Sequence, residues 1–80
     1  MQNKISIGEN IRKHRKKANM SQEQLAKALN ISTATLSAYE TDKTVPSATL
    51  IGKLALYFNT STDAFLPIET PDIQNPFIDE

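Results

Sequence analysis

The stretch QEQLAKALNISTATLSAYE, residues 22–40, decides the fold, because it has the form of two short helices joined by a tight turn. Asn30 falls where the first helix must end, and asparagine tolerates the left-handed backbone conformation that ends many helices. Ser32 follows as an N-cap for the second helix, and Ile31 between them is expected to fill the space under the turn. This order of residues predicts a helix-turn-helix.

The two helices of this stretch each have an apolar side and a polar side. The residues expected to face the core are Leu25, Leu29, Ile31, Leu36 and Tyr39. The other side carries polar and mostly small residues, namely Gln22, Thr33, Thr35 and Ser37.

Length and composition exclude several classes of protein. Eighty residues are enough for one small domain. The chain has no cysteine and one histidine, so we expect no disulfide, no metal site and no cofactor. It lacks a glycine-rich phosphate loop and a set of converging reactive groups, so we do not expect an enzyme. No segment approaches the roughly 20 apolar residues of a membrane span, and the N-terminus lacks the apolar run of a signal peptide, so we expect a cytoplasmic protein.

Charge is distributed unevenly along the chain. Nine basic and nine acidic residues give a net charge of zero. All nine bases lie within residues 1–66 together with five of the acids, so this part carries a charge of +4. Residues 67–80 hold the other four acids and no base. The sequence therefore predicts a basic body and an acidic tail.

A first helix is expected before the central stretch. Ser6 and Glu9 form a capping-box pattern that starts this helix at Ile7, and a second such pattern, Ser21 with Gln24, starts the next one. The expected buried stripe of the first helix is Ile7, Ile11, His14 and Ala18. In this position a single histidine is expected to pack at the edge of the core. The basic run RKHRKK, residues 12–17, is either a solvated face or a set of phosphate contacts.

Two more helices are expected after the central stretch. The run TDKTVPS, residues 41–47, predicts a loop anchored by Val45. Ser47 is expected to cap a fourth helix, which is buried through Ile51, Leu54, Ala55 and Phe58. Ser61 is expected to cap a short fifth helix over residues 62–66, which Pro67 ends. Residues 67–80 hold three prolines and no helical or strand period, so we expect them to be irregular.

The motifs IGENIRKHR, SQEQLAKALNIS, LSAYETDKTVPS and STDAFL, in this order, resemble the lambda-repressor-like DNA-binding domains of the Cro and xenobiotic-response-element (XRE) type. The resemblance covers residues 7–66, about three quarters of the chain. It implies an all-α fold class, with a compact five-helix DNA-binding domain over residues 1–66. The irregular acidic tail, residues 67–80, would then serve as a dimer arm or a linker.

The resemblance also implies a function. It predicts a bacterial or phage-encoded, nucleoid-associated transcription regulator, a repressor that binds a two-fold symmetric double-stranded DNA operator as a homodimer through a recognition helix over residues 33–40. It implies that Gln22 binds a phosphate and helps to lock the recognition helix in place. It also implies that Arg15 and Glu40 form an ion pair between the first helix and the end of the third. The sequence departs from the family pattern at Asn30 and Asp42, where glycine is common.

The expected DNA contacts fall into two groups. Those expected to face the bases are Ser32, Thr33, Ala34, Ser37 and Ala38. Those expected to contact phosphates are Ser21, Gln22, Lys43, Thr44 and Ser47. The base-facing group lacks Arg, Lys, Asn and Gln, the side chains that make bidentate contacts with bases, so hydroxyl groups and methyl contacts with thymine remain. We therefore expect phosphates to supply most of the affinity, and weak base contacts with DNA shape to supply the specificity.

Apolar residues outside the expected core are the candidates for a dimer interface. They are Leu50, Leu56, Tyr57, Ala64 and Phe77. We expect dimerisation through the fifth helix and its surroundings. The alternative is that these are scattered apolar surface residues of the ordinary kind, or residues that the tail of the same subunit covers. The alternative function is an antitoxin-type interaction module, which would bind a partner protein through residues 67–80 and regulate its own promoter.

Overall fold

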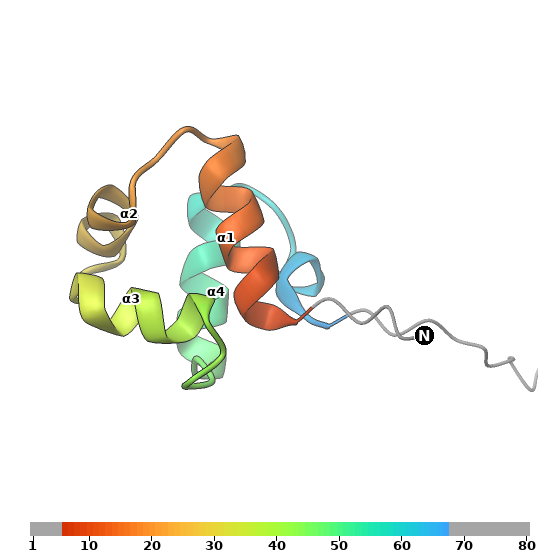
Figure 1. The fold of residues 1–80 in the computed structure, drawn as a ribbon. Coiled ribbons are helices and arrows are strands. Elements are labelled where there is room, and N and C mark those ends of the chain that lie inside the picture. The colour runs from red at the N-terminus through yellow and green to blue at the C-terminus, as the bar shows by residue number, and fades with distance from the viewer. Residues whose placement is uncertain (1–5, 68–80) are drawn as a thin grey trace, which may run out of the picture.

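The structure is a computed structural model that describes residues 6–67. This part of the chain contains four α-helices and a short 3-10 helix, and it has no strand (Figure 1). The elements are α1 (Ile7–Lys17), α2 (Gln22–Leu29), α3 (Thr33–Glu40), α4 (Ala48–Tyr57) and η1 (Thr62–Phe65). The prediction of an all-helical fold is confirmed for these residues.

The short fifth helix predicted over residues 62–66 is present only as the 3-10 helix η1, so residues 6–67 contain four α-helices and not five. The Ala64 amide donates to the Ser61 carbonyl at 3.1 Å, and the Leu66 amide donates to the Asp63 carbonyl at 3.2 Å. Both bonds span three residues, as in a 3-10 helix, where an α-helical bond spans four. The side chain of Ser61 makes no capping hydrogen bond, and Pro67 has no N–H group with which to extend the helix.

Each α-helix starts after a serine whose hydroxyl group accepts a hydrogen bond from a backbone amide three residues later. These four N-caps are Ser6, Ser21, Ser32 and Ser47. At Ser21 the capping box is complete, because Gln24 Oε1 also accepts a hydrogen bond from the Ser21 amide at 2.8 Å. The serine pattern therefore sets four helix starts as predicted.

Each α-helix is also followed, within two residues, by a residue with positive φ that is not glycine. These residues are Asn19, Asn30, Asp42 and Asn59, with φ between 56° and 63°. At Asn30 (φ 62°, ψ 44°) the following Ile31 amide reaches back to the Ala26 carbonyl at 2.9 Å, which closes a Schellman motif. The left-handed turn predicted at Asn30 is thus present.

The helices enclose one small core. Helices α2 and α3 lie to one side of α1 and α4, and η1 lies on the other side against both (Figure 1). The buried apolar residues are Ile11, Leu25, Ala26, Leu29, Leu36, Leu50, Ile51, Leu54, Ala55 and Phe65. His14 lies at the edge of this core, where its ring centroid is 4.6 Å from that of Phe65 and its Nδ1 atom is 2.9 Å from the Asn10 carbonyl oxygen.

Some core positions differ from the sequence-based expectation. Val45 does not anchor the loop, because 73% of it is exposed and the neighbouring Pro46 is buried in its place. Ala18 is exposed, because it is the C-cap of α1 and lies beyond the part of the helix that packs. Asn10 is buried, which the sequence did not predict. Its Nδ2 atom donates to the Leu66 carbonyl at 3.1 Å, and this bond ties the end of η1 to α1.

Candidate nucleic-acid interface

Helix α3 presents a face of small residues to solvent, which we call the outward face. Its members are Ser32, Thr33, Ala34, Ser37, Ala38 and Thr41. The residues at its two ends, 32–34 and 41, are exposed, and Ser37 and Ala38 are half-buried. The five residues predicted to face the bases thus lie together on the surface. Thr41 was not predicted, although it follows Ala34 by seven residues and so falls on the same side of the helix.

Two hydroxyl groups of the outward face already make hydrogen bonds within the protein. Ser32 Oγ accepts from the Thr35 amide at 3.0 Å and donates to Thr35 Oγ1 at 2.9 Å. Thr41 Oγ1 donates to the Ser37 carbonyl at 2.9 Å. The single hydroxyl proton of Ser32 and that of Thr41 are therefore both donated to the helix itself.

The end of α3 is held in place by the carboxylate of Glu40. Arg15 Nε lies 2.7 Å from Glu40 Oε2, and Arg15 Nη2 lies 3.2 Å from Glu40 Oε1. The same guanidinium donates to the Met20 carbonyl at 2.9 Å, and Gln22 Nε2 donates to Glu40 Oε1 at 2.9 Å. The side chain of Glu40 is only 2% exposed and that of Arg15 only 11%. This buried, bidentate and further hydrogen-bonded pair fixes α1, the start of α2 and the end of α3 against one another.

A second link joins the end of α3 to the start of α1. Asp42 Oδ1 accepts a hydrogen bond from the Gly8 amide at 3.1 Å, and Asp42 itself adopts φ 63°. A carboxylate at the N-terminus of a helix also interacts favourably with the helix dipole. Asp42 thus takes the left-handed conformation and also caps a distant helix.

The residues predicted to contact phosphates lie at the start of α2, in the loop after α3 and at the start of α4. Gln22 is half-buried at the start of α2, and the other four, Ser21, Lys43, Thr44 and Ser47, are exposed. Ser21 and Ser47 begin α2 and α4, and Lys43 and Thr44 lie in the loop after α3. The amides of Lys43 and Thr44 donate to the Ala38 carbonyl at 2.9 and 3.3 Å, so these two residues lie beside the end of α3. The Gln22 side chain also binds Glu40, so it does not project freely into solvent.

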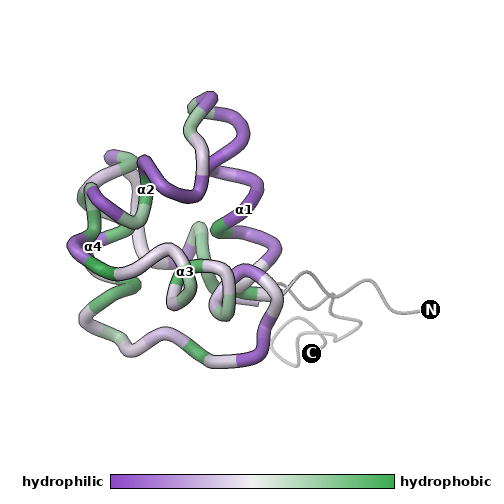
Figure 2. The backbone as a smooth tube through the Cα atoms, turned by 60° about the vertical axis from the view of Figure 1, so that its left-hand side comes forward, coloured by the Kyte–Doolittle hydropathy of each residue, from purple (hydrophilic) through white to green (hydrophobic). Residues whose placement is uncertain are grey.

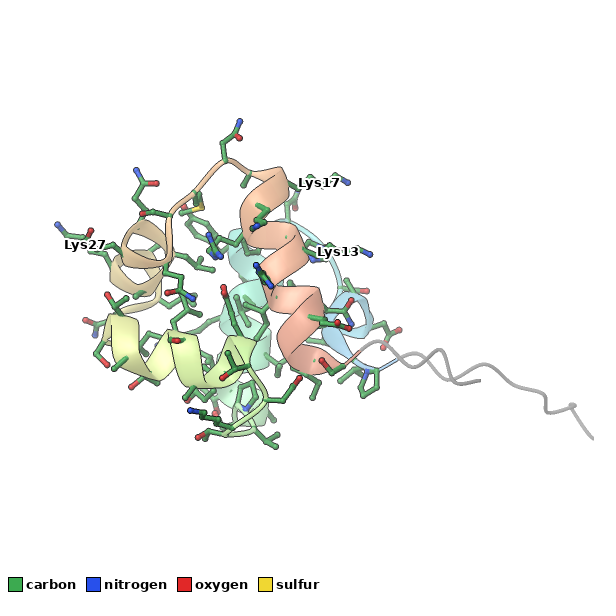
Figure 3. The ribbon with its side chains drawn as sticks, viewed as in Figure 1. Lys13, Lys17 and Lys27 are labelled. Atoms are coloured by element: carbon green, nitrogen blue, oxygen red, sulfur yellow. The ribbon has the colours of Figure 1, made fainter. Side chains whose placement is uncertain are left out.

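Figure 3 shows the positions of three further lysines, Lys13, Lys17 and Lys27. Lys13 and Lys17 lie on the side of α1 away from α2 and α3, and Lys27 points outward from α2 (Figure 3). Helix α1 is mainly hydrophilic, whereas most of α3 has intermediate hydropathy (Figure 2). Of the two interpretations of the basic run, the positions of Lys13 and Lys17 favour a solvated face.

The predicted dimer residues do not form one group. Leu50 must be removed from it, because it is 6% exposed and belongs to the core. The buried side of α4 is wider than predicted, since residues one position apart, such as Leu50 and Ile51, both pack inward. Leu56 and Tyr57 are 82% and 48% exposed. Ala64 is partly buried against the core, and Phe77 lies outside the described residues.

Two further properties concern residues 6–67. In this range no three His, Cys, Asp or Glu side chains come together in a way that could hold a metal ion. No helix in the same range has both the length and the apolar character needed to cross a membrane.

The short helices α2 and α3, the Asn30 turn between them and the outward face define a helix-turn-helix protein. A comparison with protein families agrees: the family described as "Helix-turn-helix" matches residues 11–65. The chain belongs to this family.

Individual relatives were found as well. The chain is 37% identical over 62 residues to the HTH-type transcriptional regulator ImmR of Bacillus subtilis (strain 168), a match that covers 78% of this chain and 49% of that protein. The chain thus spans about half the length of this curated relative. Among solved structures it is similar to the P22 c2 repressor in complex with a synthetic operator, with 31% identity, a TM-score of 0.70 and coverage of 76% of this chain and 92% of the repressor chain.

One enzyme also contains this fold. Hydroxypropylphosphonic acid epoxidase from S. wedmorenis matches with 24% identity and a TM-score of 0.73 over 88% of this chain and 38% of the epoxidase chain. At this identity the likeness concerns the fold alone.

Proposed function

We propose that this protein is a DNA-binding transcriptional regulator that acts as a repressor and binds its operator through α3. The observation that carries this proposal is the outward face, a solvent-facing row of small side chains on a helix that Glu40 and Asp42 hold in place. Such a helix can enter the major groove of B-DNA. The names of the relatives support the same function, since one is a transcriptional regulator and another is a repressor with its operator. Such a regulator acts in the cytoplasm, at the nucleoid.

In the proposed complex the outward face meets base edges and α2 crosses the DNA backbone. The proposed phosphate contacts are Ser21, Gln22, Lys43, Thr44 and Ser47. The amide groups at the start of α4 add a partial positive charge next to Ser47. Glu40 orients the Gln22 side-chain amide through one Nε2 proton. The second Nε2 proton can then be donated to a phosphate oxygen.

The operator is proposed to be two-fold symmetric, with a dimer on half-sites roughly one helical turn apart. Leu56 and Tyr57 are the exposed apolar residues that support a dimer interface on α4, with Ala64 and Phe77 as further members. The alternative antitoxin-type function depends on the tail, and residues 68–80 lie outside the described part of the chain. The repressor function is the one that the described residues support.

The proposal is tested by selecting bound sequences from random DNA and measuring their affinity for variants of the protein. Ala34→Glu places a negative charge on the outward face and should abolish binding. Lys13→Glu is the control, because Lys13 lies on the side of α1 away from α2 and α3 (Figure 3) and its charge changes by more than that of Ala34→Glu. It should bind nearly as well as the unmodified chain. Selection of no sequence, or equal loss in both variants, would reject this interface.

A further inference from the structure

We infer that α3 recognises the 5-methyl groups of pyrimidines, so that 5-methylcytosine can replace thymine in the operator. This inference rests on the proposed function and names the chemical group that the outward face reads. In the major groove, thymine differs from cytosine by an O4 acceptor in place of an N4 donor and by its 5-methyl group. A protein can therefore read either the hydrogen-bonding edge or the methyl group.

The outward face has little with which to read a hydrogen-bonding edge. None of its six residues has a charged or amide side chain, so the face offers no bidentate contact with guanine or adenine. The Ser32 and Thr41 hydroxyl protons are already donated within the helix. The hydroxyl groups of Thr33 and Ser37 remain, but a hydroxyl group both donates and accepts, so it bonds to either kind of base edge.

The outward face does present methyl groups. Thr33 supplies a γ-methyl group at the first position of α3, and Ala34 and Ala38 supply β-methyl groups one turn apart. All three lie on the N-terminal two turns, the part of a recognition helix that reaches base edges. Because these side chains are short, contact with a base requires close approach of the helix. At that distance a thymine methyl group is excluded from water and packs against them.

The rigidity of α3 makes this readout selective. Glu40 is bonded to Arg15 and Gln22, and Asp42 is bonded to Gly8, so the end of α3 is tied to α1 and α2. Alanine has no side-chain rotamers, and threonine has few. The face therefore cannot adjust to fill the space that a missing methyl group leaves, and each such gap weakens binding.

The test uses the full 80-residue chain and an operator selected from random DNA. At each thymine of a half-site, four base pairs are compared: T·A, U·A, 5-methylcytosine·G and C·G. This set varies the methyl group and the hydrogen-bonding edge independently. At the contacted positions we expect T·A and 5-methylcytosine·G to bind with similar affinity. Loss of the methyl group, in U·A or C·G, should weaken binding about fourfold per position. This is the change in Kd that corresponds to the burial of one carbon group.

Two matched variants test the role of Thr33. Thr33→Ser keeps the hydroxyl group and removes the methyl group, whereas Thr33→Val keeps a methyl group and removes the hydroxyl group. The methyl preference at the position facing Thr33 should disappear in Thr33→Ser and persist in Thr33→Val. Any change in DNA shape caused by uracil is the same for both variants, so the comparison isolates the contact.

Three other outcomes count against the inference. If T·A and U·A bind equally and both exceed the two G-containing pairs, the face reads the hydrogen-bonding edge; the inference is then rejected and the proposed function stands. If Thr33→Ser keeps the full methyl preference at every position, the contact assigned to Thr33 is rejected. If no sequence is selected over random DNA, the proposed function itself fails and the inference fails with it.

Discussion

The Gly8 amide lies 3.1 Å from Asp42 Oδ1, so the first turn of α1 is capped by a residue that follows α3. This contact is close because Gly8 has no side chain. A Cβ atom at position 8 would lie 2.8 Å from the Glu40 carbonyl oxygen and 2.7 Å from Asp42 Oδ1, and it would also collide with the Tyr39 carbonyl oxygen. The glycine thus lets the start of α1 approach the end of α3.

Gly8→Ala should therefore destabilise the fold. Because two of the crowded neighbours are backbone atoms, the helices must move apart, and we expect a loss of about 1–3 kcal/mol in the free energy of unfolding. Urea denaturation measures it. Gly52→Ala is the control, because no atom lies within 4 Å of a Cβ atom built there and the residue is inside α4. It should raise stability by about 0.5–1 kcal/mol. Equal effects at the two positions would contradict the steric role of Gly8.

The Arg15–Glu40 pair should behave as a buried ion pair. Removing one partner, in Arg15→Met, leaves a carboxylate that is 2% exposed without its cation, and we expect a loss of about 3 kcal/mol or more. The double variant Arg15→Met with Glu40→Leu should be more stable than the single one, since no unpaired charge remains. A double-mutant cycle from urea denaturation gives the coupling energy. Additive losses would show that the pair acts through packing alone.

The left-handed turn of the helix-turn-helix depends on Asn30. Asn30→Ala places an ordinary side chain at φ 62°, so we expect a loss of about 1 kcal/mol, whereas Asn30→Gly should keep or raise stability. Thermal unfolding of the two variants provides the measurement. Asn19 and Asn59 have similar φ values of 59° and 56°, so the same pair of substitutions there should give the same order. A reversed order at position 30 would mean that the asparagine side chain, and not the backbone, stabilises the turn.

The helix starts and the central turn could be predicted because local chemistry determines them. A serine before each α-helix and an asparagine after α2 act through bonds to neighbouring residues. What the sequence did not reveal depends on distant contacts. The Gly8–Asp42 bond spans 34 positions, and the burial of Asn10 depends on Leu66, 56 positions away. The Arg15–Glu40 pair was expected only through resemblance to a family.

In the candidate site, too, the residues of a known motif could be predicted, whereas contacts between distant residues could not. The outward face was predicted from the helix-turn-helix motif, which places the N-terminal residues of its second helix at base edges. Only Thr41, at the end of this face, was missed. A role of Gln22 in holding the recognition helix was expected through the resemblance, but its bond to Glu40 was not, because that bond depends on how α2 and α3 cross. Leu50 was assigned to the wrong surface because the periodic stripe gives the centre of a buried side and not its width.

Lys43 is predicted to bind a phosphate in the complex with DNA. Lys43→Ala should therefore flatten the slope of log K against log salt by about one unit and leave the ranking of operator sequences unchanged. Lys13→Ala is the matched control, because Lys13 lies on the side of α1 away from α3 (Figure 3), and its slope should stay that of the unmodified chain. Fluorescence anisotropy at several salt concentrations measures both. A changed ranking with an unchanged slope would assign Lys43 to the bases.

Substitutions at Leu56 and Leu50 should distinguish a residue of the dimer interface from a residue of the core. Leu56→Glu replaces a residue that is 82% exposed, so the monomer should keep its stability while the dimer dissociates through the charge placed in an apolar contact. Leu50→Ala removes a buried side chain and should cost about 2–5 kcal/mol of unfolding free energy. Sedimentation at micromolar concentration, with and without operator DNA, follows the dimer, and urea denaturation follows the fold. A monomer in the unmodified chain under both conditions would reject the interface on α4, whereas a dimer that survives Leu56→Glu would place the contact elsewhere on the surface.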